Sequence, residues 1–227
     1  MNDRKLVNLT SGSFIVLSVL LMFLIPAKPA HRLPPDLNMP IIALELAETP
    51  AELYNVIGDQ KSDCRNRHVY GTYVDFLYIL SYVLAFISLG YVMKKRKYLQ
   101  RTHFYVLFAI MLLAALGDVV ENIFLFDLLG RTEGENIADQ LFWLGRSTYF
   151  KWSTLGLAAG IISGGLVRYG KRKIGIIFAG AFGAALIGLY LRPAIELQVI
   201  ALSAAWPWVF VKTLPLKFPW FTENIES

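Results

Sequence analysis

Apolar residues along this chain fall into six long blocks, and short segments between them carry most of the charged residues. A helix needs about 20 apolar residues to cross the hydrocarbon core of a bilayer, or fewer when flanking side chains reach the interface. Each block approaches that length, which predicts an all-α, polytopic membrane protein. The six predicted spans cover residues 11–25, 73–93, 104–129, 148–167, 174–191 and 195–211.

The order of these spans predicts one membrane domain with two parts. Residues 1–167 form a four-span helical core that includes an outer loop at residues 26–72. Residues 168–227 add a hairpin of two spans and an aromatic, proline-rich tail that suits the membrane interface. The last span is the weakest prediction, because Glu196 and Pro207 interrupt it.

The first span has a second interpretation. Arg4 and Lys5 precede a short apolar stretch, which is also the pattern of a secretory signal peptide. A signal peptide ends in small residues at its cleavage site, and the sequence around Ala27 and Ala30 lacks a convincing run of them. The sequence therefore favours an uncleaved membrane span.

Lysine and arginine concentrate in two short connections, at residues 94–101 and 168–173. Short loops rich in these residues stay on the cytoplasmic side of a membrane. Both chain termini are then cytoplasmic, the loops at residues 26–72 and 130–147 face outward, and the default location is a bacterial inner membrane or an equivalent plasma membrane. Topology thereby explains the net charge of +5, and no nucleic-acid partner is expected.

The composition supports a bilayer as the solvent and offers little to bind a cofactor. Hydrophobic residues make up 56% of the chain, which exceeds the content of a typical soluble domain.

Cys64 is the single cysteine, and no Cys/His spacing resembles a zinc or iron–sulfur site. His31, His68 and His103 fall at depths too different for one three-histidine site. We expect neither a cofactor nor a metal.

The outer loop carries signals for short helices. Thr49, Pro50 and Glu52 provide a capping residue, a first-turn proline and a Glu three positions after the Thr. The predicted helix runs to about residue 57, where Gly58 ends it. Just before it, residues 39–47 have the pattern of a helix on the membrane surface. That helix is either a simple lid on the bundle or an element that contributes Glu45 to a site.

Three polar residues interrupt the apolar block at residues 106–129: Asp118, Glu121 and Asn122. A carboxylate in hydrocarbon costs a few kcal/mol on insertion scales, about 2.5 to 3.5 for an Asp at a helix centre, so it requires a partner, a proton or a water-filled cavity. The three side chains share one helical face, because they are spaced i, i+3 and i+4. The third span is therefore expected to present all three to neighbouring helices.

Depth in the membrane brings further polar residues to the same level. Asp118 lies about 22 Å along a helix that enters near His103 and rises 1.5 Å per residue. Asp75 and Lys151 each lie about one turn inside a span that enters from the outer side. Tyr78 and Tyr82 follow Asp75 on the same face. The predicted ligand-binding residues in this layer of the outer leaflet are Glu45, Asp75, Tyr78, Tyr82, Asp118, Glu121, Asn122 and Lys151.

Three hypotheses explain this layer. The surplus of acids over one lysine favours a site that binds or translocates a small cation, a proton or an amphipathic ligand. A second hypothesis is a membrane enzyme that acts on a lipid or isoprenoid, with Asp118 or Glu121 as the catalytic acid or base. A third is a structural lock between helices, in which Lys151 neutralises one carboxylate and other groups satisfy the rest.

Small residues repeat every fourth position on the predicted fourth and fifth spans. Gly156, Gly160 and Gly164 give the fourth span a smooth face on which another helix can pack closely. On the fifth span, Gly180, Ala184 and Gly188 have the same spacing and give a similar face. These faces fit either packing within one chain or a homodimer through the three glycines of the fourth span.

Four short motifs carry a resemblance to known proteins: ALELA at residues 43–47, VDFLY at 74–78, GDVVEN at 117–122 and FKW at 150–152. In this order the chain resembles a family of uncharacterised bacterial integral membrane proteins, usually of four spans. The resemblance extends over residues 7–167 and adds no activity. It implies that the following residues belong to one pattern: Glu45, Asp75, Asp118, Glu121, Asn122 and Lys151.

Overall fold

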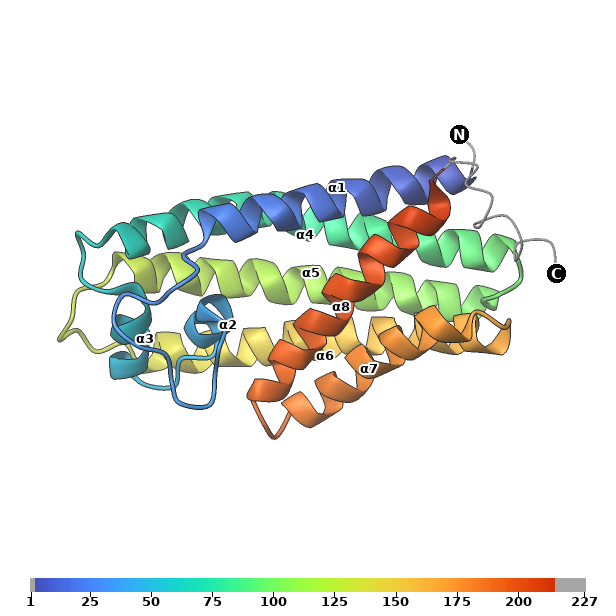
Figure 1. Cartoon of the computed structure of the whole chain (residues 1–227). Helices are drawn as coiled ribbons and strands as arrows, with labels where there is room; N and C mark the ends of the chain where they lie inside the picture. Colours follow the sequence, from blue (N-terminus) through green and yellow to red (C-terminus); the bar gives the residue numbers. More distant parts are fainter. Residues whose placement is uncertain (1–2, 215–227) are drawn as a thin grey trace.

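The computed structural model describes residues 3–214, and all regular structure in that part of the chain is helical. The predicted interfacial tail at residues 215–227 lies outside the described residues. The helices are α1 (Asp3–Leu24), α2 (Pro40–Glu45), α3 (Pro50–Ile57), α4 (Asp63–Lys95), α5 (Arg101–Gly130), α6 (Ala138–Arg168), α7 (Arg172–Gly188) and α8 (Pro193–Thr213) (Figure 1).

Five of these helices are long and apolar enough to cross a membrane: α1, α4, α5, α6 and α8. Each coincides with one of the predicted spans, so the prediction of an all-α protein with several helices that could cross a membrane is confirmed. The helices α4 and α6 begin about ten residues before the predicted spans at 73–93 and 148–167. These extra turns carry polar residues at one end of the bundle.

The remaining predicted span, at residues 174–191, corresponds to α7. This helix has 17 residues, which gives a length of about 26 Å at 1.5 Å per residue, short of the roughly 30 Å hydrocarbon core. It ends at Gly188, where the amides of Tyr190 and Leu191 both turn back to the carbonyl of Ile187. A sixth span therefore stays a prediction.

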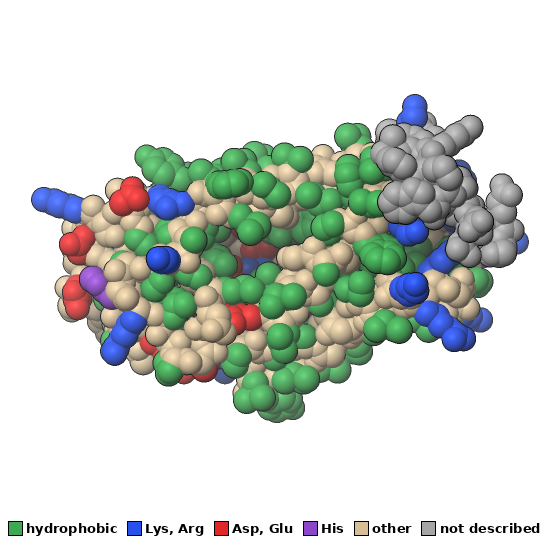
Figure 2. Space-filling model, viewed as in Figure 1, with side chains coloured by type: hydrophobic (Ala, Val, Ile, Leu, Met, Phe, Trp, Pro, Cys, Tyr) green, Lys and Arg blue, Asp and Glu red, His purple; other side chains and the backbone are tan. Residues whose placement is uncertain are grey.

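The long helices α1, α4, α5 and α6 lie alongside one another, and α8 crosses them obliquely (Figure 1). At one end of the bundle lie α2 and α3, and we name this the loop end. At the opposite end lie the start of α1, the end of α8 and the connections at residues 96–100 and 169–171, and we name this the basic end. Lys and Arg side chains gather on its surface (Figure 2).

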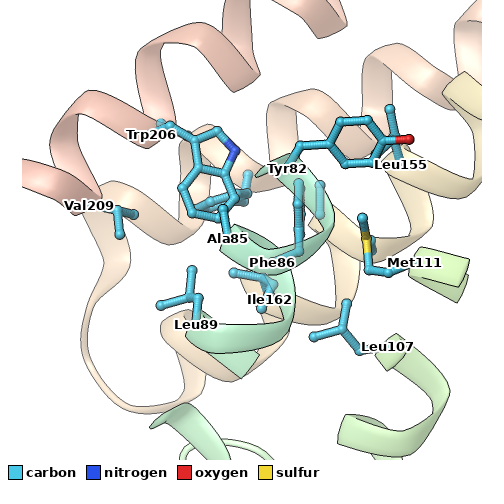
Figure 3. Packing of buried hydrophobic residues seen from close by; sticks show 14 of the residues in the cluster. Tyr82, Ala85, Phe86, Leu89, Leu107, Met111, Leu155, Ile162, Trp206 and Val209 are labelled. Carbon is cyan, nitrogen blue, oxygen red and sulfur yellow. The ribbon is translucent and has the colours of Figure 1, made fainter. Parts of the chain in front are cut away.

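Trp206 of α8 belongs to the larger of two hydrophobic clusters and packs there with residues of other helices (Figure 3). Its side chain is fully buried and its ring packs edge-on against Phe14 of α1, Phe86 of α4 and Phe178 of α7, with ring centroids 4.9 to 5.9 Å apart. Four helices thus meet at one indole. The C-terminal hairpin α7–α8 is joined to the core rather than set apart from it.

The helix predicted after Thr49 is present as α3. The Thr49 hydroxyl accepts a hydrogen bond from the Glu52 amide at 3.2 Å, and Gly58 ends the helix with φ of 75°. The preceding α2 differs from the prediction of a membrane-surface helix. Its residues from Ile42 to Glu45 are all buried, because its apolar side chains pack on the protein rather than on lipid.

The glycines of α6 are used within the chain. A side chain at Gly156 would collide with Ala185 of α7, and one at Gly160 would press on Phe182. Gly164 differs, since a Cβ placed there would meet no atom within 4 Å. Two of the three glycines therefore allow α7 to approach α6 closely, and the homodimer through this face stays a prediction.

Candidate functional site

Lys151 of α6 is surrounded by carboxylates from two other helices. Its Nζ lies 2.5 Å from Glu121 Oε1 and 3.4 Å from Asp118 Oδ1, both of α5, and 3.1 Å from Glu45 Oε2 of α2. These four side chains, all at least nine-tenths buried, meet at one ammonium group. Together with Asp75 of α4, described below, we name them the carboxylate–lysine cluster.

The spacing of residues on α5 aims its acids at α6. Asp118, Glu121 and Asn122 are all buried on the same face of the helix, as the i, i+3, i+4 spacing predicts. Gly117 lets the two helices come close, because a Cβ at that position would lie 2.9 Å from the Phe150 ring and 3.3 Å from the Lys151 amide nitrogen. Sequence analysis gave Gly117 no role, although it stands directly before Asp118.

The helix α4 adds a second layer of polar contacts. The Tyr82 hydroxyl donates a hydrogen bond to Asp118 Oδ2 at 3.0 Å, and Asn122 Nδ2 donates to Asp75 Oδ2 at 2.7 Å. Asp75 is half-buried, unlike the other acids of the cluster. Tyr78 lies beside Tyr82, with ring centroids 5.8 Å apart, and stacks on Phe14. It borders the cluster without a hydrogen bond to it among the described contacts.

Glu45 reaches the cluster because α2 is held against α6. The Thr148 hydroxyl donates to the Glu45 carbonyl at 3.1 Å, and Trp152 Nε1 donates to Glu45 Oε2 at 3.2 Å. Burial raises the pKa of Glu45 above its usual range, while the charge of Lys151 opposes that rise. The contacts of both roles that the sequence left open for this helix are present, since α2 packs on the bundle as a lid would and Glu45 also contacts Lys151. Whether this cluster is a ligand site stays a prediction.

The cluster holds more potential negative charge than it can neutralise internally. Its four carboxylates and one ammonium would leave a surplus of three negative charges if every group were ionised. Glu121 Oε2 and Asp118 Oδ1 are buried and accept no hydrogen bond from the described residues. A buried, unpaired charge is costly, so the surplus must be met by protons or by a bound cation.

The surface is hollowed near the cluster. Figure 2 shows a recess bordered by α1, α2 and α8, with acidic and basic side chains visible in its floor. Near the basic end α1 and α8 are joined by hydrogen bonds from Asn8 to the Phe210 carbonyl and to Thr213. Toward the loop end the two helices diverge (Figure 1), and the recess opens where they separate.

Two residues of the C-terminal hairpin fasten the segment that carries α2. Arg192 makes paired contacts of 2.7 Å with Asp36 and of 3.0 Å with Glu52, and it also donates to the Leu46 carbonyl. Glu196, which is buried, accepts hydrogen bonds of 2.6 Å from the amides of residues 38 and 39 at the start of α2. Sequence analysis missed both roles, and the position of Glu196 inside an apolar span was the available signal.

The Arg192 contacts predict how stability depends on pH. Hydrogen bonds from Arg192 hold the pKa values of Asp36 and Glu52 below their usual range, so the unfolded state binds these two protons more readily than the folded state does. The stabilisation is therefore fully present above a pH of about 4 to 4.5 and is lost as pH falls through the folded-state pKa values. The melting temperature of wild type should exceed that of Arg192→Gln at pH 7, and the difference should shrink below pH 4.

Melts of Lys61→Gln supply the control for this prediction, since Lys61 is an exposed cation in the same outer segment. Its melting temperature should follow that of wild type throughout the pH range. A constant difference between wild type and Arg192→Gln from pH 7 to pH 3 would show that the two ion pairs do not contribute to folding.

Comparison with models of known families, with characterised proteins and with solved structures gives no match for this chain. Within residues 3–214 no group of three or more His, Cys, Asp or Glu side chains has the arrangement of a metal site. The carboxylate–lysine cluster therefore stands as the candidate functional site by its geometry and charge.

Proposed function

We propose that this chain is a multi-pass membrane protein that binds, and in doing so can translocate, a small cation, a proton or a cationic amphipathic ligand at the carboxylate–lysine cluster. One observation carries the proposal: in a largely buried site, three carboxylates contact a single lysine, and a fourth, that of Asp75, lies beside them on Asn122. A structural lock between helices would require no surplus of carboxylates over their positively charged and hydrogen-bonding partners. Surplus acids within membrane helices commonly mark pathways for ions or protons.

The topology belongs to the same proposal. The basic end faces the cytoplasm with both termini, by the rule that Lys/Arg-rich connections stay inside, and the protein lies in an inner or plasma membrane. The helix α7 then serves as a short sixth span, and α2 and α3 lie on the outer side. This orientation places the cluster in the outer leaflet, where the recess between α1 and α8 gives a ligand access from the side.

Thermal melts in detergent test the proposal by mass action, because a ligand that binds only the folded state raises the melting temperature. Wild type and Asp118→Asn are screened against monovalent and divalent cations, alkylammonium ions, lipids and pH. A ligand at about 100 times its Kd stabilises by about 2.7 kcal/mol, which corresponds to a rise of roughly 5 to 10 °C in wild type. The rise should be absent in Asp118→Asn.

Asp127→Asn is the matched control. Asp127 lies on the same helix as Asp118, but it is partly exposed and pairs with Arg131 outside the cluster. Its ligand response should equal that of wild type. A destabilised Asp118→Asn variant, together with no ligand response in wild type across the screen, would instead establish the structural lock.

The recess in Figure 2 also favours a second candidate function, an enzyme acting on a lipid or isoprenoid. A substrate entering from the side would meet Asp118, paired to the Tyr82 hydroxyl, and Glu121, paired to Lys151. Such pairs suit proton transfer to and from a substrate. Conversion of a lipid by purified wild type, abolished in Glu121→Gln, would favour this candidate over simple binding.

A further inference from the structure

A second hollow lies at the basic end of the bundle, well away from the carboxylate–lysine cluster. It is a groove of about 610 Å³ between α6, α7 and the connection that joins α4 to α5. Its volume is within the range of about 300 to 1,000 Å³ typical of sites for small molecules. We infer that this groove binds one anionic phospholipid, with the phosphate at Arg168 and His103 and an acyl chain lying along α6.

The wall of the groove is apolar along its length and polar at one end, as a lipid with an acyl chain and a headgroup requires. Its apolar part runs along α6 through Leu157 and Ile161 and is completed by Phe182 of α7. Its polar part is formed by the cationic side chain of Arg168 at the end of α6 and by the imidazole of His103 near the start of α5. Eleven residues separate Leu157 from Arg168, which is about 16 Å along a helix and matches half of a roughly 30 Å hydrocarbon core.

A glycine on α6 leaves room in the groove for an acyl chain. Gly164 lines the groove and a Cβ added there would meet no atom within 4 Å. Its neighbour one turn away, Gly160, also lines the groove, but a Cβ added there would lie 3.1 Å from the Phe182 ring. The glycine face of α6 is thus divided between contact with α7 and an open surface at Gly164.

Charge at this end favours an anionic headgroup. The connections beside the groove carry Lys and Arg at residues 94–97 and 171–173. Among the described residues the single acid at this end is Asp3, and it pairs with Lys95. No carboxylate lines the groove. Basic pockets between membrane helices at a bilayer surface are a recurring form of site for anionic lipids.

Native mass spectrometry of the purified full chain, mixed with phosphatidylglycerol or phosphatidylcholine, tests the inference. Wild type should bind phosphatidylglycerol at one site and phosphatidylcholine about fivefold or more weakly, the factor expected when one cation meets a headgroup with a net negative charge rather than one whose phosphate is neutralised by choline. Gly164→Leu should fill the groove and lower the affinity for phosphatidylglycerol by at least about tenfold. Arg168→Gln should remove most of the preference between the two lipids.

Two variants control for indirect effects. Gly180→Leu makes the same change on α7, where an added side chain also meets no atom within 4 Å but the residue does not line the groove. Arg172→Gln removes an exposed cation next to the groove. Both should bind phosphatidylglycerol as wild type does, and all four variants should keep the melting temperature of wild type in lipid-free detergent within a few degrees.

Equal affinity of wild type for the two lipids would overturn the inference, as would unchanged binding of phosphatidylglycerol in Gly164→Leu. A wild-type dimer that Gly164→Leu converts to monomers without loss of lipid would assign the groove to a second copy of the chain, and would also overturn it. The test does not depend on the ligand of the carboxylate–lysine cluster.

Discussion

Replacing Lys151 with methionine is expected to lower the free energy of unfolding by about 3 to 5 kcal/mol, the cost of removing one partner from a buried ion pair. Lys151 is the single cation within reach of Glu45, Asp118 and Glu121 in the described structure. Without it, these buried acids lose their shared counter-charge. The melting temperature in detergent should fall by roughly 6 to 20 °C.

Lys173→Met controls for the loss of a lysine, because Lys173 is exposed at the basic end, and it should melt as wild type does. The double variant Glu121→Gln, Lys151→Met should recover part of the lost stability, since it also removes the carboxylate that lies closest to Lys151. A Lys151→Met variant with the melting temperature of wild type would mean that the acids are protonated in the native protein and that the lysine is dispensable for folding.

Sequence reasoning could place the membrane helices and one layer of the site. A bilayer imposes the same length and polarity on every span, so the apolar blocks located α1, α4, α5, α6 and α8. The rise per residue then put Asp118 and Lys151 at one depth. In the structure Lys151 Nζ lies 3.4 Å from Asp118 Oδ1. The depth of a residue in a predicted span, calculated from the rise per residue, can be compared between helices far apart in sequence because a membrane supplies a common reference plane.

The same reasoning could not find which apolar surfaces pack on protein and which face lipid. Lipid chains and protein interiors are equally apolar, so the pattern of α2 fitted a membrane-surface helix although its residues are buried in the protein. Contacts between residues far apart in sequence were missed for a related reason. Glu196 was interpreted only as an interruption of a weak span and Arg192 was given no role, because their partners lie about 140 to 158 residues away.

These long-range contacts connect the two parts of the chain. Glu196 holds the amides at the start of α2, and Arg192 holds Asp36 and Glu52 on either side of it. The α7–α8 hairpin thereby positions the segment that delivers Glu45 to Lys151. A four-span core without the hairpin would keep the contacts of Thr148 and Trp152 with Glu45 but would lose those of Arg192 and Glu196 with the segment around α2, so the hairpin contributes to the support of the site.

The second large effect is expected from Trp206→Ala, which should lower the free energy of unfolding by about 3 to 5 kcal/mol, the range for removing a buried aromatic side chain from a core. Trp206 is fully buried and packs against rings from α1, α4 and α7. Its loss leaves a cavity at the point where four helices meet, and a fall in melting temperature measures the cost.

Trp208 is the matched control, since it lies on the same helix but is 41% exposed. Trp208→Ala should cost less than about 1 kcal/mol, as is usual for substitutions away from the core. If the two variants melted at the same temperature, α8 would be held to the bundle by its loop-end contacts alone, and Arg192 and Glu196 would then carry the attachment. A much larger loss of stability in Trp206→Ala would show that the core contacts of Trp206 hold α8 in place. The contacts of Arg192 and Glu196 would then act on a helix that is already fixed, and their main effect would be to orient α2 toward Lys151.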